Sequence, residues 1–242
     1  MAIQRFLAFT EAEMGGISDL PEKTAWMGLH FSSHFPGITP PPASLPSGSL
    51  LILDDRIPLK NQDLELICRE LWGFISEFSS PALLLDFQRP KSGLTEALVN
   101  RLAASLPVIL PPEYADGREC PVFLPPVPPD TSLAEFLRPW SGREIWLELA
   151  LDGLEITLTE SGALSRPLPY ATPCAPAHRE ERLHCHYHMH IGQEEVRFTL
   201  WRTREDVDAL VTEAEALGVM GCVGLWQEFK PSPGGKVPRR GG

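Results

Sequence analysis

The chain has 242 residues, which suits one large domain or two small ones, and 43% of them are hydrophobic, enough for a substantial core. Its net charge of −11 argues against non-specific binding to nucleic acid, because such binding needs basic surface to displace counterions. The same charge disfavours an anionic membrane surface. No apolar run approaches the roughly 20 residues that a transmembrane helix requires.

The five cysteines are scattered along the chain and odd in number. This usage is typical of reduced thiols in a cytoplasm and not of a disulfide framework. The N-terminal segment carries Glu11 and Glu13 and lacks the basic-then-apolar layout of a signal peptide. We therefore expect a cytoplasmic protein.

Eight short apolar runs recur along the chain, and some are continuous instead of alternating, as between Leu50 and Leu53. Strands of a parallel sheet have this pattern, because both of their faces are buried. The runs are Arg5–Thr10, Trp26–Ser33, Ser49–Asp55, Ala82–Gln88, Leu106–Leu110, Pro121–Leu124, Glu144–Leu149 and Gly221–Trp226.

Helical patterns lie between several of these runs. Apolar stripes at helical spacing predict a helix over residues 64–75 and, more weakly, another over residues 94–102. The last predicted helix begins at a capping-box-like pair, Thr203 and Asp206, and ends before Gly218. Strand and helix in alternation predict a parallel α/β architecture.

The strand count and the chain length favour a (βα)8 TIM-type barrel, irregular because some connections are too short for full helices. A doubly wound open sheet is the alternative. No Gly-x-Gly-x-x-Gly turn follows the first strands, which removes the most frequent cofactor argument for that fold.

A segment near the C-terminus interrupts the alternation of strand and helix. Residues 184–191 and 195–201 alternate with period two around a Gly-Gln pair, which predicts a β-hairpin inserted before the last βα unit. We expect one barrel domain over residues 1–230 and a disordered tail over the Gly- and Pro-rich residues 231–242.

Two segments together resemble the family 18 glycoside hydrolases, the chitinase-like barrels. Asp86, Phe87 and Pro90 are similar to the end of that family's fourth strand, where an Asp-x-x-Asp-x-Asp-x-Glu motif continues into an aromatic residue and a proline. Residues 203–226 resemble its last helix and eighth strand, whose terminal tryptophan, here Trp226, forms the floor of the sugar subsite.

This resemblance implies the family's fold over roughly residues 5–229, but the chain departs from the family at its chemistry. The proton-donating Glu of the family falls at Gln88, and its earlier Asp residues fall at Leu84 and Pro81. The predicted sixth strand lacks the Met-x-Tyr-Asp that orients the substrate's acetamido group. Because an amide has no proton to give at neutral pH, the resemblance implies a non-hydrolytic relative that binds an oligosaccharide or cell-wall glycan.

Polar side chains follow several of the predicted strands, at the end where barrel enzymes place their sites. The candidates for catalysis are Asp86, Gln88 and Asp54, and the two Asp residues could form a carboxylate pair for acid–base or metal chemistry. Each rim residue alone also fits a turn or cap role, and Asp86 with Arg89 fits a buried ion pair. The expected ligand-binding residues are Asp86, Gln88, Arg89, Trp226, Glu228, Tyr114 and His30.

Four of the seven histidines alternate within the predicted hairpin and therefore share one face of a strand. Imidazoles at this spacing can share Zn, Cu or Ni. A solvated hairpin face is the simpler interpretation, so we expect no metal and no cofactor. The four are His184, His186, His188 and His190.

Three functions stay open. The first is a binding module, a degenerate barrel that holds a glycan or another polar ligand at its rim without cleaving it. The second is an enzyme, a glycoside hydrolase or other hydrolase that uses different rim carboxylates. The third is a scaffold or assembly protein with a vestigial site. Gln88 argues against the inherited mechanism, which leaves Asp54, Asp86, Glu113 or Glu228 to carry the enzymatic alternative.

Overall fold

A computed structural model describes residues 2–14, 20–21, 23–60, 63–168 and 175–230, so the predicted tail lies outside the described residues. The larger sheet has eight strands in the order β5-β4-β3-β2-β1-β13-β7-β6, and its neighbours pair in parallel. The strands are β1 (Gln4–Phe9), β2 (Thr24–His30), β3 (Leu50–Asp54), β4 (Leu83–Asp86), β5 (Val108–Ile109), β6 (Val122–Leu124), β7 (Ile145–Leu149) and β13 (Gly221–Leu225).

The two end strands of this order also meet. Leu110, directly after β5, bridges Val122 of β6 in parallel. The Leu110 N–H donates to the Pro121 carbonyl (2.9 Å), and the Phe123 N–H donates to the Leu110 carbonyl (2.8 Å). The sheet therefore closes on itself, and the (βα)8 TIM-type barrel predicted from the sequence is confirmed.

Successive side chains of a strand enter two different apolar layers. On β3, Leu50 and Ile52 belong to the cluster inside the barrel, whereas Leu51 and Leu53 belong to the cluster shared with the helices. Inward and outward positions alternate along each strand of a closed barrel. Because both layers are buried, the strand has no polar face, which explains its continuous apolar run.

Three helices of ordinary length surround the barrel as predicted. They are α2 (Leu64–Glu77), α3 (Gly93–Ser105) and α6 (Arg204–Ala216). Thr203 caps α6, and its side chain accepts a hydrogen bond from the Asp206 N–H, as the capping-box pattern indicates. None of the helices in the described ranges is long and apolar enough to cross a membrane.

The remaining helices are single turns, and no helix lies between β2 and β3 within the described residues. The predicted irregularity of the barrel is thus confirmed. These short elements are α1 (Glu11–Met14), α4 (Pro112–Ala115), α5 (Leu133–Leu137), a 3-10 helix (Arg138–Trp140) and α7 (Trp226–Phe229).

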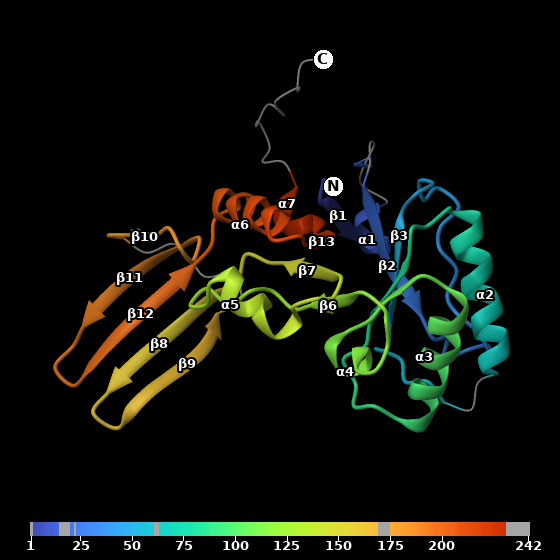
Figure 1. Cartoon of the computed structure of the whole chain (residues 1–242), viewed down its shortest axis with the longest axis horizontal. Coiled ribbons are helices and arrows are strands. Elements are labelled where there is room, and N and C mark those ends of the chain that lie inside the picture. The colour runs from blue at the N-terminus through green and yellow to red at the C-terminus, as the bar shows by residue number, and fades with distance from the viewer. Residues whose placement is uncertain (1, 15–19, 22, 61–62, 169–174, 231–242) are drawn as a thin grey trace, which may run out of the picture.

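A five-stranded antiparallel sheet in the order β10-β11-β12-β8-β9 is inserted between β7 and α6. Figure 1 shows it beside the barrel, on the side away from α2 and α3. The predicted hairpin is present as β11 (Cys185–Ile191) and β12 (Glu195–Trp201). The insertion is larger than predicted, since β8 (Gly153–Thr159), β9 (Gly162–Leu168) and β10 (His178–Glu180) complete it.

Arg202, at the end of β12, ties the inserted sheet to the barrel. Its guanidinium is buried and donates to the carbonyls of Val127 and Pro128, which follow β6. It also donates to the carbonyls of Leu183 and His184, which precede β11. One cation therefore holds the segment after β6 against the segment before β11.

Candidate functional site

The carboxyl ends of the parallel strands form one rim of the barrel. Asp86 ends β4 and Trp226 directly follows β13, so both residues lie at this end of the barrel. A cavity of about 90 Å³ opens in the middle of this rim. Three polar side chains, Asp86, Gln88 and Glu148, line it. Its apolar walls include Ala8, Met27, Ile52, Leu84, Phe123 and Leu225.

Asp86 and Gln88 are joined by a short hydrogen bond. The Gln88 amide nitrogen Nε2 donates to Asp86 Oδ1 at 2.6 Å. Burial raises the pKa of the Asp86 carboxyl, and the hydrogen bond from Gln88 opposes this change because it favours the charged form. The neighbouring Asp54 and Asp55 carboxylates raise the pKa further. Asp86 and Gln88, which the resemblance aligns with the end of the family's catalytic motif, thus line the mouth cavity together.

Asp54 lies beside Asp86 in the register of β3 and β4, as the predicted carboxylate pair requires. Its carboxylate is already paired, however, with Arg56 Nε donating to Oδ2 at 2.8 Å and Arg56 Nη2 at 2.7 Å from the same oxygen. Asp54 is also not among the described residues that line the mouth cavity. The arrangement leaves Asp86 as the member of the pair that lines the mouth cavity.

Asp55 fixes the segment that carries Gln88. Its buried carboxylate accepts hydrogen bonds from the backbone N–H groups of Gln88 (2.8 Å) and Arg89 (3.0 Å). In return, Arg89 donates from Nε to the Asp55 carbonyl and from Nη2 to the Arg56 carbonyl, both at 2.8 Å. The Arg89 guanidinium therefore fastens the β3 exit to the β4 exit and does not line the cavity.

Glu148, on β7, is the mouth residue that the sequence analysis missed. It comes from a strand three positions around the barrel from β4, and its carboxyl lines the same cavity as Asp86. Burial raises the pKa of Glu148 to about 7, and the like charges of Asp86, Asp152 and Glu228 add to the change. A signal existed in the sequence, because Glu148 is the one charged residue of the apolar stretch from Ile145 to Leu149.

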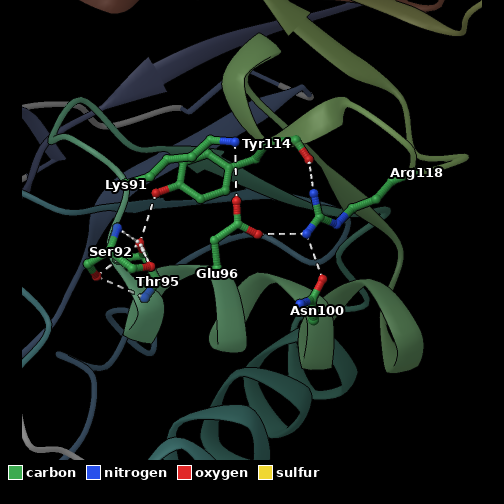
Figure 2. A network of polar contacts seen from close by, with 7 residues as sticks. All are labelled: Lys91, Ser92, Thr95, Glu96, Asn100, Tyr114 and Arg118. Atoms are coloured by element: carbon green, nitrogen blue, oxygen red, sulfur yellow. Dashed lines mark hydrogen bonds and ion pairs between the residues drawn. The ribbon is translucent and has the colours of Figure 1, made fainter.

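Tyr114, expected at the rim, is buried in a polar network behind β4. Figure 2 shows its hydroxyl donating to Thr95 Oγ1, at 2.9 Å, beside the start of α3. Lys91 Nζ lies 5.0 Å from the centre of the Tyr114 ring and 3.1 Å from Glu96 Oε1. Arg118 Nη2 reaches the other oxygen of Glu96 at 2.8 Å. With 1% of its surface exposed, Tyr114 supports the rim and offers no face to a ligand.

Trp226 is half-buried and stacks on Phe9, with ring centres 4.9 Å apart. Trp226 is absent from the described lining of the mouth cavity, whereas its neighbour Leu225 lines it. The Glu228 carboxylate accepts a hydrogen bond from the Leu151 N–H at 2.9 Å and holds the exit of β7. Glu113, the other rim acid proposed for catalysis, is exposed on α4.

His30 lies in a second, wider hollow next to the mouth. This hollow has a volume of about 660 Å³ and shares Met27 with the mouth cavity. His30 Nε2 is 3.0 Å from Thr39 Oγ1. Glu11 and Arg56 also line the hollow, which extends the polar surface of the rim over the ends of β1, β2 and β3.

The histidines of the inserted sheet each have separate surroundings. His184 Nε2 lies 2.6 Å from Glu213 Oε2, and His186 Nδ1 lies 2.8 Å from Asp206 Oδ2. His188 Nδ1 is 2.9 Å from the Pro176 carbonyl, and His190 is exposed. Across the described ranges, no three His, Cys, Asp or Glu side chains are grouped to hold a metal ion.

No protein-family model and no curated protein matches the sequence. Solved structures do match. A class V chitinase from Nicotiana tobaccum has a TM-score of 0.56 at 10% identity, over 93% of each chain. The chain has the fold of the family 18 chitinases. A family 18 chitinase from Cycas revoluta, in complex with (GlcNAc)3, has a TM-score of 0.54 at 12% identity, over 91% of this chain and 94% of that one.

The spore cortex-lytic enzyme SleL of Bacillus cereus has the same fold, with a TM-score of 0.52 at 8% identity, over 96% of this chain and 72% of that one. At such identities the likeness establishes the family 18 barrel fold and no more. Some of these structures are of variants in which a glutamate is replaced by glutamine, in complex with a tetramer of N-acetylglucosamine.

Proposed function

We propose that this chain is a glycan-binding relative of the family 18 barrels that does not hydrolyse its ligand by the family's mechanism. The observation that carries the proposal is Gln88, an amide at the position where the resemblance implies the proton donor, hydrogen-bonded to Asp86 at the barrel mouth. General acid catalysis needs a group that gives up a proton near neutral pH, and an amide does not.

The polar groups of the mouth suit recognition of a sugar. A ligand that displaces the bond between Gln88 and Asp86 would find a donor and an acceptor on the amide and an acceptor on the carboxylate. Complexes of chitinases of the same fold that carry a glutamate-to-glutamine change and hold (GlcNAc)4 support this reading, because they pair such a change with a bound oligosaccharide.

The size of the mouth limits how a glycan would sit. A cavity of about 90 Å³ takes one substituent of a sugar ring, whereas the neighbouring hollow of about 660 Å³ has room for further rings. We therefore place an oligosaccharide across both, with Trp226 as an apolar platform at the edge of the mouth. The expected dissociation constant is about 0.1–1 mM, or about −4 to −5.5 kcal/mol.

The test is a titration with chitin-derived and peptidoglycan-derived oligosaccharides, followed by NMR, with products analysed in parallel. We expect shifts at the Gln88 side-chain amide and intact ligands. Trp226→Ala should weaken binding about tenfold, because aromatic anchors dominate such sites. Trp72→Ala, a change of an exposed tryptophan on α2, is the matched control and should bind as the parent does.

Folding must be checked for Trp226→Ala, since loss of a packed Trp can cost about 3–5 kcal/mol. If no rim residue shifts at millimolar ligand, the glycan-binding proposal fails and the scaffold alternative replaces it. If the ligand is cleaved and cleavage persists in Gln88→Ala, the chain is a hydrolase that uses another carboxylate. The raised pKa of Glu148, about 7, favours this hydrolase alternative, because such a carboxyl is suited to proton transfer at neutral pH.

A further inference from the structure

Glu148 differs from Asp54, Asp86 and Glu228 in that its carboxyl has no hydrogen-bond or ion-pair partner among the described residues. Asp54 is paired with Arg56, Asp86 accepts from Gln88, and Glu228 accepts from the Leu151 N–H. Within the described part of the chain, no hydrogen bond or ion pair reaches the Glu148 carboxyl. A polar group in a cavity with apolar walls and no internal partner is available to a ligand.

The charged groups that act on Glu148 are all acidic. Asp86 faces it from β4, Asp152 follows it in the loop after β7, and Glu228 approaches from α7. The arginines that act on Asp86 and Asp152 are Arg56 and Arg202, and both are engaged elsewhere: Arg56 pairs with Asp54, and Arg202 donates to backbone carbonyls. Like charges and burial both favour the neutral form of the carboxyl. In that form it has an O–H to donate, which an ionised carboxylate lacks.

We propose that Glu148 recognises the glycan as a neutral carboxylic acid, donating its O–H to an uncharged hydroxyl or carbonyl oxygen of the ligand. This inference rests on the proposed glycan-binding function and adds to it a selectivity for the charge of the ligand. The mouth would then favour an uncharged sugar and disfavour an anionic one, because a negative group there would lie among Asp86, Asp152 and Glu228. The family resemblance does not imply a role for this position.

The proposal predicts a specific dependence of binding on pH. With the pKa of Glu148 at about 7, nearly all of the protein carries the neutral acid at pH 5.5 and only a few per cent at pH 8.5. Because the apparent dissociation constant rises as the binding-competent fraction falls, binding of an uncharged chitin oligosaccharide should weaken roughly 30-fold between these pH values.

Three variants test whether Glu148 causes the pH dependence of binding. Glu148→Gln keeps a neutral donor at every pH, so it should bind equally at pH 5.5 and pH 8.5. Asp152→Asn removes a charge that raises the pKa of Glu148, so it should keep the pH dependence but move its midpoint to lower pH. Glu160→Gln, an exposed change in the β8–β9 turn, is the matched control and should keep the parent's midpoint.

The assay is isothermal titration with chitin tetrasaccharide at several pH values, with folding checked by circular dichroism at each. Binding that does not change with pH in the parent, or the same pH dependence in Glu148→Gln, would overturn the inference. Tighter binding at pH 8.5 would also overturn it, because the ionised carboxylate would then be the recognising form.

A measurement without ligand separates this inference from the proposed function. The side-chain carboxyl carbon of Glu148, followed by ¹³C NMR, should titrate with a midpoint near pH 7. A midpoint below about pH 5, close to an ordinary glutamate, refutes the neutral-acid role whether or not a glycan binds. If the midpoint is near 7 and no glycan binds at any pH, the proposed function is the part that fails.

Discussion

Replacing Asp55 with Ala tests whether the barrel mouth is held in shape by buried hydrogen bonds. The Asp55 carboxylate is 2% exposed and accepts two backbone N–H groups, those of Gln88 at 2.8 Å and Arg89 at 3.0 Å. A hydrogen bond to a charged group contributes about 1.5–3 kcal/mol. Because Ala leaves both N–H groups without an acceptor, we expect the free energy of unfolding to fall by about 3–5 kcal/mol.

Urea denaturation at 25 °C, followed by tryptophan fluorescence, measures this change. For a chain of this length it also corresponds to a melting temperature lower by roughly 10 °C. Asp116→Ala is the matched control, since Asp116 is exposed and has no hydrogen-bond or ion-pair partner among the described residues. It should change stability by less than about 0.5 kcal/mol. A loss below about 1 kcal/mol in Asp55→Ala would refute the reasoning, because the two bonds would then carry little energy.

Four further substitutions test the packing and charge of the barrel. A Cβ added at Gly28 would clash with the buried Trp26 ring, so Gly28→Ala should destabilise the fold by about 1–3 kcal/mol. Gly73 lies in α2 with open space around it, so Gly73→Ala should instead stabilise by about 0.5–1 kcal/mol. Arg202→Met leaves four carbonyls without their donor, and a urea midpoint unchanged within error would contradict the expected loss of about 2–4 kcal/mol. The raised pKa of Glu148 makes the folded state bind an extra proton, so the contribution of this group to stability is fully present below about pH 4.5 and is lost as the pH rises through 7. Thermal melts should therefore show Glu148→Gln equal to the parent at pH 4.5 and more stable at pH 9, and equality at both values would argue against a buried acid.

The barrel could be predicted from the sequence because its strands are buried on both faces. Runs such as Leu50 to Leu53 contain no polar residue, and a helix pattern between such runs leaves few other arrangements. The same reasoning failed for β8 and β9. The residues of β9 from Gly162 to Pro167 are exposed, so the strand has no buried apolar face that a pattern could reveal, and it contains a proline near its end.

The site could be predicted only in part. Asp86 and Gln88 meet at the mouth because the family-like segment positions both at the end of one strand. Tyr114 followed a predicted strand too, but the sequence could not reveal that its side chain turns inward to Thr95. Glu148 was not predicted because it lies inside β7, whereas rim residues are expected at the ends of strands. Whether a side chain points into the barrel depends on the register of its strand, and that register is defined only in the closed sheet.

A crystal structure of the chain with a chitin tetrasaccharide tests the central claim most directly. We predict an unbroken oligosaccharide across the barrel mouth. One oxygen-bearing substituent of a sugar ring should lie within hydrogen-bond distance of both Gln88 Nε2 and the Glu148 carboxyl. Trp226 should border the same ring. A sugar bound elsewhere on the molecule, or a cleaved product in the mouth, would contradict the account of a binding site that retains its ligand intact.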